Sequence, residues 1–269
     1  MQGNIQRSRR TRLVEPFSPF GRMNMHLSQP NIKNHPMKPT NVLAFLLVTL
    51  VLFGGCGRSM IQTRISEGTI EYDITFPDYD PNGLMAGMLP EKTQLYFDAE
   101  HQVADLSAGM GVFRTSMIAN TQKQLLDYHM SVMSKKLVSE LGPKDLVQFN
   151  KDSQAMTIVY TNVEDTIAGY PCKKAIAIYS GLEQPEVELW YTTSINMDRP
   201  NWFGPYSDIP GVLLQYEMIQ YGMRMKLRAC KVTPGPLDAQ RLVRKPDHDL
   251  VEPAVLQHEL QEVLSTFSS

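Results

Sequence analysis

Apolar and polar residues alternate along most of the chain from residue 68 onward. In the first such stretch Ile70, Tyr72, Ile74 and Phe76 are separated by smaller or polar side chains. A period of two is typical of a β-strand that buries one face. The pattern predicts about eleven strands. They cover residues 69–76, 93–98, 102–107, 112–119, 122–129, 132–139, 155–161, 172–179, 187–195, 212–220 and 223–232.

Several of these strands are separated by joins of hairpin length, such as Ala99-Glu100, Asn120-Thr121 and Tyr221-Gly222. Tight joins imply antiparallel neighbours, because parallel strands need a crossover of a dozen residues or more. The chain shows no βαβ alternation and no glycine-rich phosphate loop, which argues against Rossmann-type and P-loop folds. We expect a mainly β (α+β) protein built on one large, curved antiparallel sheet.

Two segments have helical spacing instead. The loop 77–91 carries four apolar residues on one helical face, and the segment 253–267 carries five, with Pro253 suited to a first helical turn. The loop residues are Leu84, Met85, Met88 and Leu89, and the C-terminal ones are Leu256, Leu260, Val263, Leu264 and Phe267. We expect both helices to cover the concave face of the sheet. The four loop residues are candidates for contacting an apolar ligand as a lid.

The N-terminal part of the chain has a different character. An uncharged apolar run spans 42–53, follows Met37-Lys38 and ends at Gly54-Gly55-Cys56. Twelve residues suit the h-region of a signal peptide, whereas a membrane-spanning helix needs about 20. The ending resembles a lipobox, with Phe53 in place of the usual aliphatic residue. The resemblance implies lipidation of Cys56, including an acyl chain such as palmitate. The alternative is an ordinary cleaved signal peptide.

These features divide the chain into parts. Residues 1–36 are polar and basic, so we expect a non-native extension before a true start at Met37, or else an extended n-region. Residues 37–55 form the lipoprotein signal peptide, 56–67 a tether, and 68–269 a single β-rich domain. Asp does not follow Cys56, so we expect an outer-membrane anchor facing the periplasm.

Charge and composition narrow the function classes. The chain of 269 residues has 26 Lys and Arg against 28 Asp and Glu, a net charge of −2. Residues 1–55 hold seven of the basic side chains and one acidic one, so the remainder is acidic, with a net charge of −8. This balance argues against nucleic-acid binding. Three cysteines exclude a four-cysteine zinc site and a disulfide-stapled miniprotein.

Candidate chemistry is sparse. His101, His129, His248 and His258 lack zinc-site spacing, and we expect all four at the surface. No nucleophile-elbow motif occurs. We therefore expect no catalytic residues, metal or cofactor. The many methionines fit a core or a pliable cavity lining; a Cu(I) site is the competing hypothesis.

Two further groups of residues leave alternatives open. Cys172 and Cys230 could pair in an oxidising periplasm, but a meander would place them three strands apart, about 14 Å, against a limit near 7 Å. Trp190, Trp202 and Phe203 either pack the core and the sheet edge or form an aromatic rim at a cavity mouth.

Two motifs resemble known families of secreted bacterial proteins. Residues 165–175, with the sequence DTIAGYPCKKA, are similar to a segment of a domain of unknown function. Residues 187–214, with Pro210-Gly211 at their core, resemble the GLPGLI family, although Asp208 replaces its first glycine. The resemblance implies the half-barrel of periplasmic carriers and receptors (LolA/LolB-like), and it carries no catalytic residues.

Together these features lead us to expect an envelope lipoprotein that is not an enzyme, is monomeric and holds a lipid, another apolar ligand or a lipoprotein under its sheet. The alternative is a structural or interaction protein of the envelope with a filled core.

Overall fold

The structure is a computed structural model. The structure describes residues 64–80, 82–83, 86–150, 155–180, 186–220 and 223–268. The expected signal peptide and the lipidation site, Cys56, lie outside these residues.

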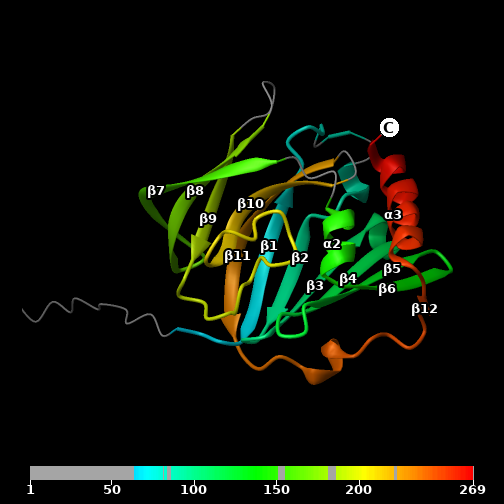
Figure 1. Ribbon diagram of the computed structural model, residues 1–269. Coiled ribbons are helices and arrows are strands. Elements are labelled where there is room, and N and C mark those ends of the chain that lie inside the picture. Colours follow the sequence, from blue (N-terminus) through cyan, green and yellow to red (C-terminus); the bar gives the residue numbers. More distant parts are fainter. Residues whose placement is uncertain are drawn as a thin grey trace, which may run out of the picture. The chain divides into compact units, whose positions relative to one another are not determined.

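One twelve-stranded sheet dominates the described part of the chain (Figure 1). Its order is β12-β6-β5-β4-β3-β2-β1-β11-β10-β9-β8-β7, and its ladders are antiparallel except for the short parallel pair β12–β6. The bounds are β1 Gly68–Thr75, β2 Lys92–Phe97, β3 His101–Ala108, β4 Phe113–Asn120, β5 Leu125–Val132, β6 Lys135–Leu141, β7 Met156–Ile167, β8 Tyr170–Tyr179, β9 Val187–Thr192, β10 Val212–Gln220, β11 Met223–Pro234 and β12 Asp249–Leu250.

The predicted fold class is confirmed: the sheet is curved and does not close, which makes it a half-barrel. Alternation works as expected in β1, where Ile70, Tyr72 and Ile74 are buried. Eleven of the twelve strands match predicted ones. The predicted turn at Asn120-Thr121 was placed too early, because residues 121–124 form that turn and β5 begins only at Leu125.

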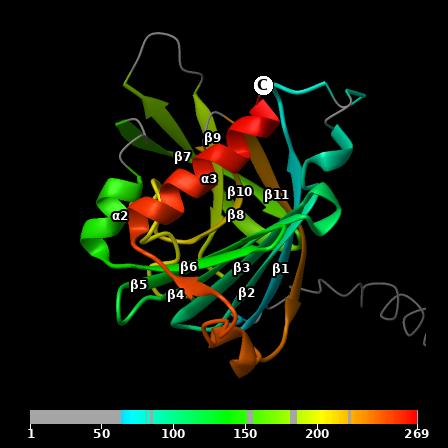
Figure 2. The ribbon, with the colours of Figure 1, turned by 90° about the vertical axis from the view of Figure 1, so that its right-hand side faces the viewer.

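Two α-helices lie on the concave side of the sheet (Figures 1 and 2). The C-terminal helix α3, Pro253–Ser268, confirms the predicted amphipathic helix, and its Leu256, Leu260 and Leu264 are buried. The helix α2, Pro143–Phe149, was not predicted. In the loop 77–91 the expected helix is wrong in extent: a single 3₁₀ turn, η1, covers Ala86–Met88. Leu84 and Met85 lie outside the described residues.

The connection after β11 crosses the outer, convex face of the sheet before the chain returns to the concave side as α3. We call residues 235–248 the outer strap; they include the 3₁₀ turn η3, Ala239–Leu242. Arg244 on the strap binds both carboxylate oxygens of Asp127, at 2.6 and 3.0 Å, and also Glu140 at 2.5 Å. Arg241 binds Asp105 at 3.0 Å. The strap therefore covers part of the outer face that alternation assigns to solvent.

The expected tether 56–67 is described only at its end. Ile65 forms a parallel bridge with Ile195, and the Asn196 N–H donates to the Ile65 carbonyl at 2.7 Å. The chain is thus attached to the domain three residues before β1 begins.

Candidate functional site

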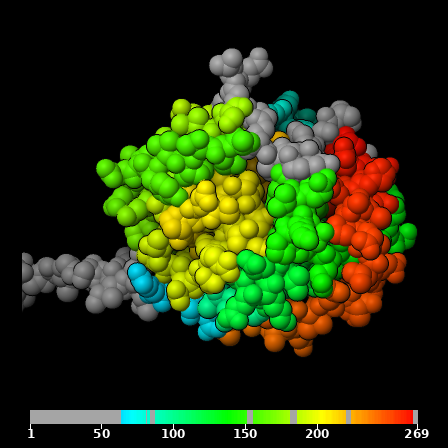
Figure 3. All heavy atoms as spheres, viewed as in Figure 1, coloured from blue at the N-terminus to red at the C-terminus, as the bar shows by residue number. Residues whose placement is uncertain are grey.

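A cavity of about 190 Å³ lies between the concave face and the connection from β9 to β10. We call this connection, residues 193–211, the cover loop. Seven strands contribute to the wall: β1 to β5, β10 and β11. Apolar side chains dominate it, among them Ile74, Leu95, Leu106, Met117, Met218, Met225 and Leu227. Figure 3 shows the cover loop filling the front of the molecule between the strands β7 and β8 and the helix α2.

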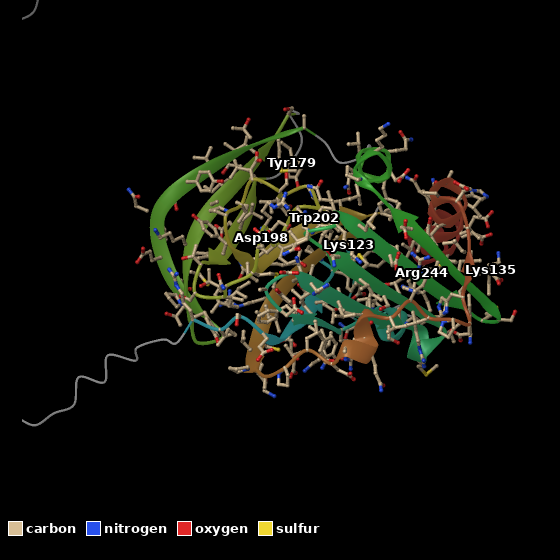
Figure 4. The ribbon with its side chains drawn as sticks, turned by 60° about the horizontal axis from the view of Figure 1, so that its bottom comes forward. Lys123, Lys135, Tyr179, Asp198, Trp202 and Arg244 are labelled. Carbon is tan, nitrogen blue, oxygen red and sulfur yellow. The ribbon has the colours of Figure 1, made fainter. Side chains whose placement is uncertain are left out.

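The cover loop is tied to the sheet near its first half. The Asp198 N–H donates to the Ala99 carbonyl at 2.9 Å, and the Arg199 guanidinium donates to the Thr121 carbonyl at 3.3 Å. Gln102, which is 4 % exposed, donates from Nε2 to the Pro200 carbonyl at 2.9 Å. These bonds fix the loop over the ends of β2 to β4. Figure 4 shows Asp198 and Trp202 on this loop.

The second half of the loop is held from both sides. Asn150, which caps α2, donates to the Phe203 carbonyl at 2.9 Å, and Tyr160 on β7 donates to the Asp208 carbonyl at 2.7 Å. Asn201 donates within the loop to the carbonyls of Ile209 and Gly211, at 3.0 and 2.9 Å. The cover loop is thereby attached to both halves of the sheet.

Gly211 explains why a Pro-Gly pair stands at the end of the cover loop. A Cβ atom at this position would lie 2.4 Å from the Thr192 carbonyl oxygen, so only glycine allows the loop to approach β9 so closely. The motif that resembles the GLPGLI family thus forms the corner where the cover loop enters β10.

A group of tyrosines forms one side of the cavity. The rings of Tyr72 and Tyr206 each lie edge-to-face with Tyr216, at centroid distances of 6.1 and 6.4 Å. Tyr72 donates to the Leu213 carbonyl at 2.8 Å, and Tyr206 donates to the Glu217 carbonyl. Burial raises the pKa of Tyr216 to about 12 and also raises the pKa of Tyr72 and of Tyr206 well above the usual value for a tyrosine. All three hydroxyls therefore stay protonated and neutral.

A second, smaller cavity of about 30 Å³ adjoins the first and contains Met88 and Leu89 in its wall. The two cavities share Leu106, Thr115, Tyr128 and Met225. The volume of the smaller cavity is enough for about one water molecule. Two of the four predicted lid residues thus lie beside the apolar interior, but the main cover is the loop 193–211, which the sequence did not indicate as a lid.

The three aromatic residues predicted as a cavity rim have separate positions. Phe203 lines the main cavity. Trp202 packs edge-to-face on Phe203 at 5.5 Å, and its buried indole N–H has no hydrogen-bond partner among the described residues. Trp190 lies outside the cavity wall on β9, where the Lys174 ammonium lies 5.9 Å from its ring centre.

Cys172 and Cys230 are both free thiols, so the candidate disulfide is absent from the structure. The sheet order places three strand steps between β8 and β11, as the meander implied. Cys172 is also buried on the inner face, whereas Cys230 is exposed on the outer face. Burial raises the pKa of the Cys172 thiol to about 11.

Two of the four histidines contradict the expectation of surface positions. The side chains of His129 and His248 are 1 % and 4 % exposed, because the outer strap covers His129 and its own His248 packs between the strap and β5. His129 Nε2 accepts from the Lys245 N–H at 3.2 Å, and the two imidazole rings lie 5.3 Å apart. Burial, with smaller contributions from the charges of Lys245 and His248, lowers the pKa of His129 to about 4.

A chain of hydrogen bonds joins the strap to β5. His248 Nε2 lies 3.0 Å from Ser131 Oγ, and its Nδ1 lies 2.9 Å from Asp247 Oδ1. The residue types are those of a serine hydrolase, but Ser131 lies in the wall of neither cavity described above. We interpret the contacts as attachment of the strap.

The described residues contain neither a cluster of metal ligands nor a membrane-spanning helix. No group of three or more His, Cys, Asp or Glu side chains is placed there to hold a metal ion. The methionines of the cavity wall lie among aliphatic and aromatic side chains. None of the helices in these ranges is long and apolar enough to cross a membrane.

The fold and the site together define a half-barrel with an apolar cavity under a tied cover loop. No protein-family model and no curated protein matches the chain. Solved structures with some likeness include PNGF-II, with a TM-score of 0.45 and 14 % identity, covering 72 % of this chain and 32 % of that one. The MucA/MucB complex of Pseudomonas aeruginosa has a TM-score of 0.31 and 9 % identity, covering 71 % and 59 %.

A beta-barrel-like protein of a domain of unknown function from Brucella abortus has a TM-score of 0.30 and 7 % identity, covering 65 % of this chain and 100 % of that one. The chain spans about a third of the length of PNGF-II, the first of these structures. At these TM-scores the likenesses carry no functional argument.

Proposed function

We propose that the protein is an envelope lipoprotein that binds an apolar ligand in the cavity between its sheet and the cover loop. The observation that carries the proposal is the cavity itself, which has mostly apolar walls and a volume of about 190 Å³. An engineered apolar cavity of about 150 Å³ is large enough to bind benzene. The proposed role is binding, and it needs no catalytic residue.

The anchoring part of the proposal rests on the sequence. The apolar run 42–53 followed by Gly54-Gly55-Cys56 supports lipidation of Cys56 and placement at the outer membrane, facing the periplasm. The GLPGLI-like motif at the end of the cover loop supports membership of that family of secreted proteins. Metabolic labelling with an alkyne fatty acid tests the anchor in a bacterial host. We expect label on the wild type and none on C56S; equal labelling of both would refute it.

A second candidate function is a structural or interaction protein of the envelope with a filled interior. The size of the cavity favours it, because ligand pockets are usually about 300–1,000 Å³, larger than the 190 Å³ found here. The two functions differ in a measurable way, since only the first predicts saturable uptake of a small apolar molecule.

A fluorescence titration distinguishes them. The full chain with C56S avoids competition from its own acyl chains, and W190F leaves Trp202 as the single tryptophan. The neutral dye N-phenyl-1-naphthylamine is added as the apolar probe. We expect saturable dye fluorescence and a change in Trp202 emission, because Trp202 packs on Phe203 in the cavity wall. No saturable binding would favour the filled-core function.

A further inference from the structure

The cavity wall carries polar groups that the protein leaves available. Gln102 donates from Nε2 to the Pro200 carbonyl, and this is its one side-chain hydrogen bond to the described part of the chain. The hydroxyls of Thr115 and Tyr216 lack a protein partner among the described residues. Thr115 is 8 % exposed and Gln102 is 4 % exposed, so both side chains are buried. Neither Gln102 Oε1 nor either of the two hydroxyls is among the fully buried polar atoms that lack a partner, so each retains access to the cavity, where a ligand can supply the hydrogen bond.

The same wall contains no charged side chain and no histidine. Burial raises the pKa of Tyr216 to about 12 and also that of Tyr72, which shows how strongly this interior disfavours a negative charge. A carboxylate placed there would have no cation to pair with, and an unpaired buried charge is far more costly than an unpaired dipole.

The polar groups lie at different levels of the cavity. Thr115 pairs with Leu106 across β3 and β4, whereas Gln102 lies four residues before Leu106 on β3. At the rise of a β-strand this separates the two levels by about 13 Å. Ala104 lines the wall between the two levels and is apolar, as is Leu106 beside Thr115. The arrangement suits an elongated apolar body with an oxygen near an end.

We propose that the cavity selects an uncharged amphiphile, with an apolar body and a hydroxyl or carbonyl oxygen, and rejects an ionised fatty acid of the same length. This inference rests on the proposed function, since it names the class of ligand that the same cavity takes. Tyr216 on β10 and Thr115 on β4 each offer a hydroxyl donor to a ligand oxygen from a different part of the wall, and Gln102 Oε1 offers an acceptor to a ligand hydroxyl.

Competition for the bound dye tests the inference on the full chain with C56S. At pH 8 the dye is displaced with 1-decanol or with decanoate, which have the same chain length and differ in charge. We expect decanol to displace the dye at a concentration at least 10-fold lower, because an unpaired buried charge costs several kcal/mol. Equal displacement by the two compounds, or displacement by neither, would overturn the inference while leaving the proposed function intact. Failure of the dye itself to bind would instead refute the proposed function.

A pair of variants tests the polar wall. Y216F removes one donor and should weaken decanol binding about 2–10-fold, the effect of one hydrogen bond. Y96F is the matched control, because Tyr96 lies outside the cavity wall, where Arg241 stacks on its ring. An equal loss in both variants, or no loss in Y216F, would contradict a role for Tyr216.

Discussion

Filling the cavity from within should remove ligand binding without harming the fold. Ala104 on β3 lines the cavity, between Gln102 and Leu106. In A104F a phenyl ring replaces a hydrogen and points into the space that the ligand would take. Ser107 on the same strand is exposed, so S107F adds the same ring outside the cavity and serves as the control.

The change that A104F makes in the free energy of unfolding differs in sign between an open and a filled interior. In a filled core, an added ring forces neighbours apart and costs about 1–3 kcal/mol. A cavity of about 190 Å³ exceeds the ~150 Å³ that accepts benzene. Burying a Phe side chain gains about 1.5–3 kcal/mol, of which about 1 kcal/mol is lost in side-chain entropy. We therefore expect A104F to be between neutral and about 2 kcal/mol more stable.

Thermal unfolding and dye titration measure the two consequences together. In a domain of this size, 1 kcal/mol shifts Tm by about 2–4 °C. We expect A104F to keep or raise Tm and to lose dye binding, while S107F keeps both near wild type. A fall in Tm of more than about 4 °C in A104F, with S107F unchanged, would show that the interior is filled. Retained dye affinity in A104F would place the dye elsewhere.

Three further predictions concern the strap and the thiols. R244Q should lower the free energy of unfolding by about 1 kcal/mol, the scale of a partly exposed ion-pair network. The control K123Q removes one positive charge from a site without an ion pair in the described chain. Equal urea midpoints for the two variants would refute a stabilising role for Arg244. Because the pKa of His129 is depressed to about 4, its neutral form stabilises the fold above pH 6.5, and about 3 kcal/mol is lost as pH falls from 6.5 to 4. H129Q should flatten that profile in denaturant titrations, and an unchanged slope would count against it. Native alkylation followed by mass spectrometry should modify Cys230 and spare Cys172; a bridged peptide would contradict the free thiols.

The alternation of residues predicted the sheet well because one strand face packs in the core and the other meets solvent. The prediction from alternation was wrong where the outer face of the sheet is covered by another segment of the chain. His129 sits on the outer face of β5, so alternation assigns it to solvent, yet a distant segment of chain covers it. No local sequence pattern predicts that the outer strap covers β5, because the strap is polar and is held by ion pairs and backbone hydrogen bonds.

The cover of the cavity was misplaced for a related reason. Met88 and Leu89 were predicted as lid residues because apolar residues at helical spacing must be buried. The cover loop has no such periodicity; it is held by polar contacts from Gln102 and Asn150, which a sequence does not reveal. The nearest signal was the pair Trp202-Phe203. The helix α2 escaped notice because seven residues give less than two periods of a helical pattern.

The order of the strands has a consequence for how the chain reaches this structure. Strands β1 to β6 form one run of sequential antiparallel neighbours and β7 to β11 another, and among the described strands the β1–β11 ladder is the one that joins the two runs. Each run consists of local contacts, which form quickly, whereas the ladder closes a long loop and is expected to form late. Tyr72 and Leu95 from the first run and Tyr216 and Leu227 from the second all line the cavity. A ligand bound in the cavity would contact both runs of strands. It would therefore slow the separation of the β1–β11 ladder during unfolding.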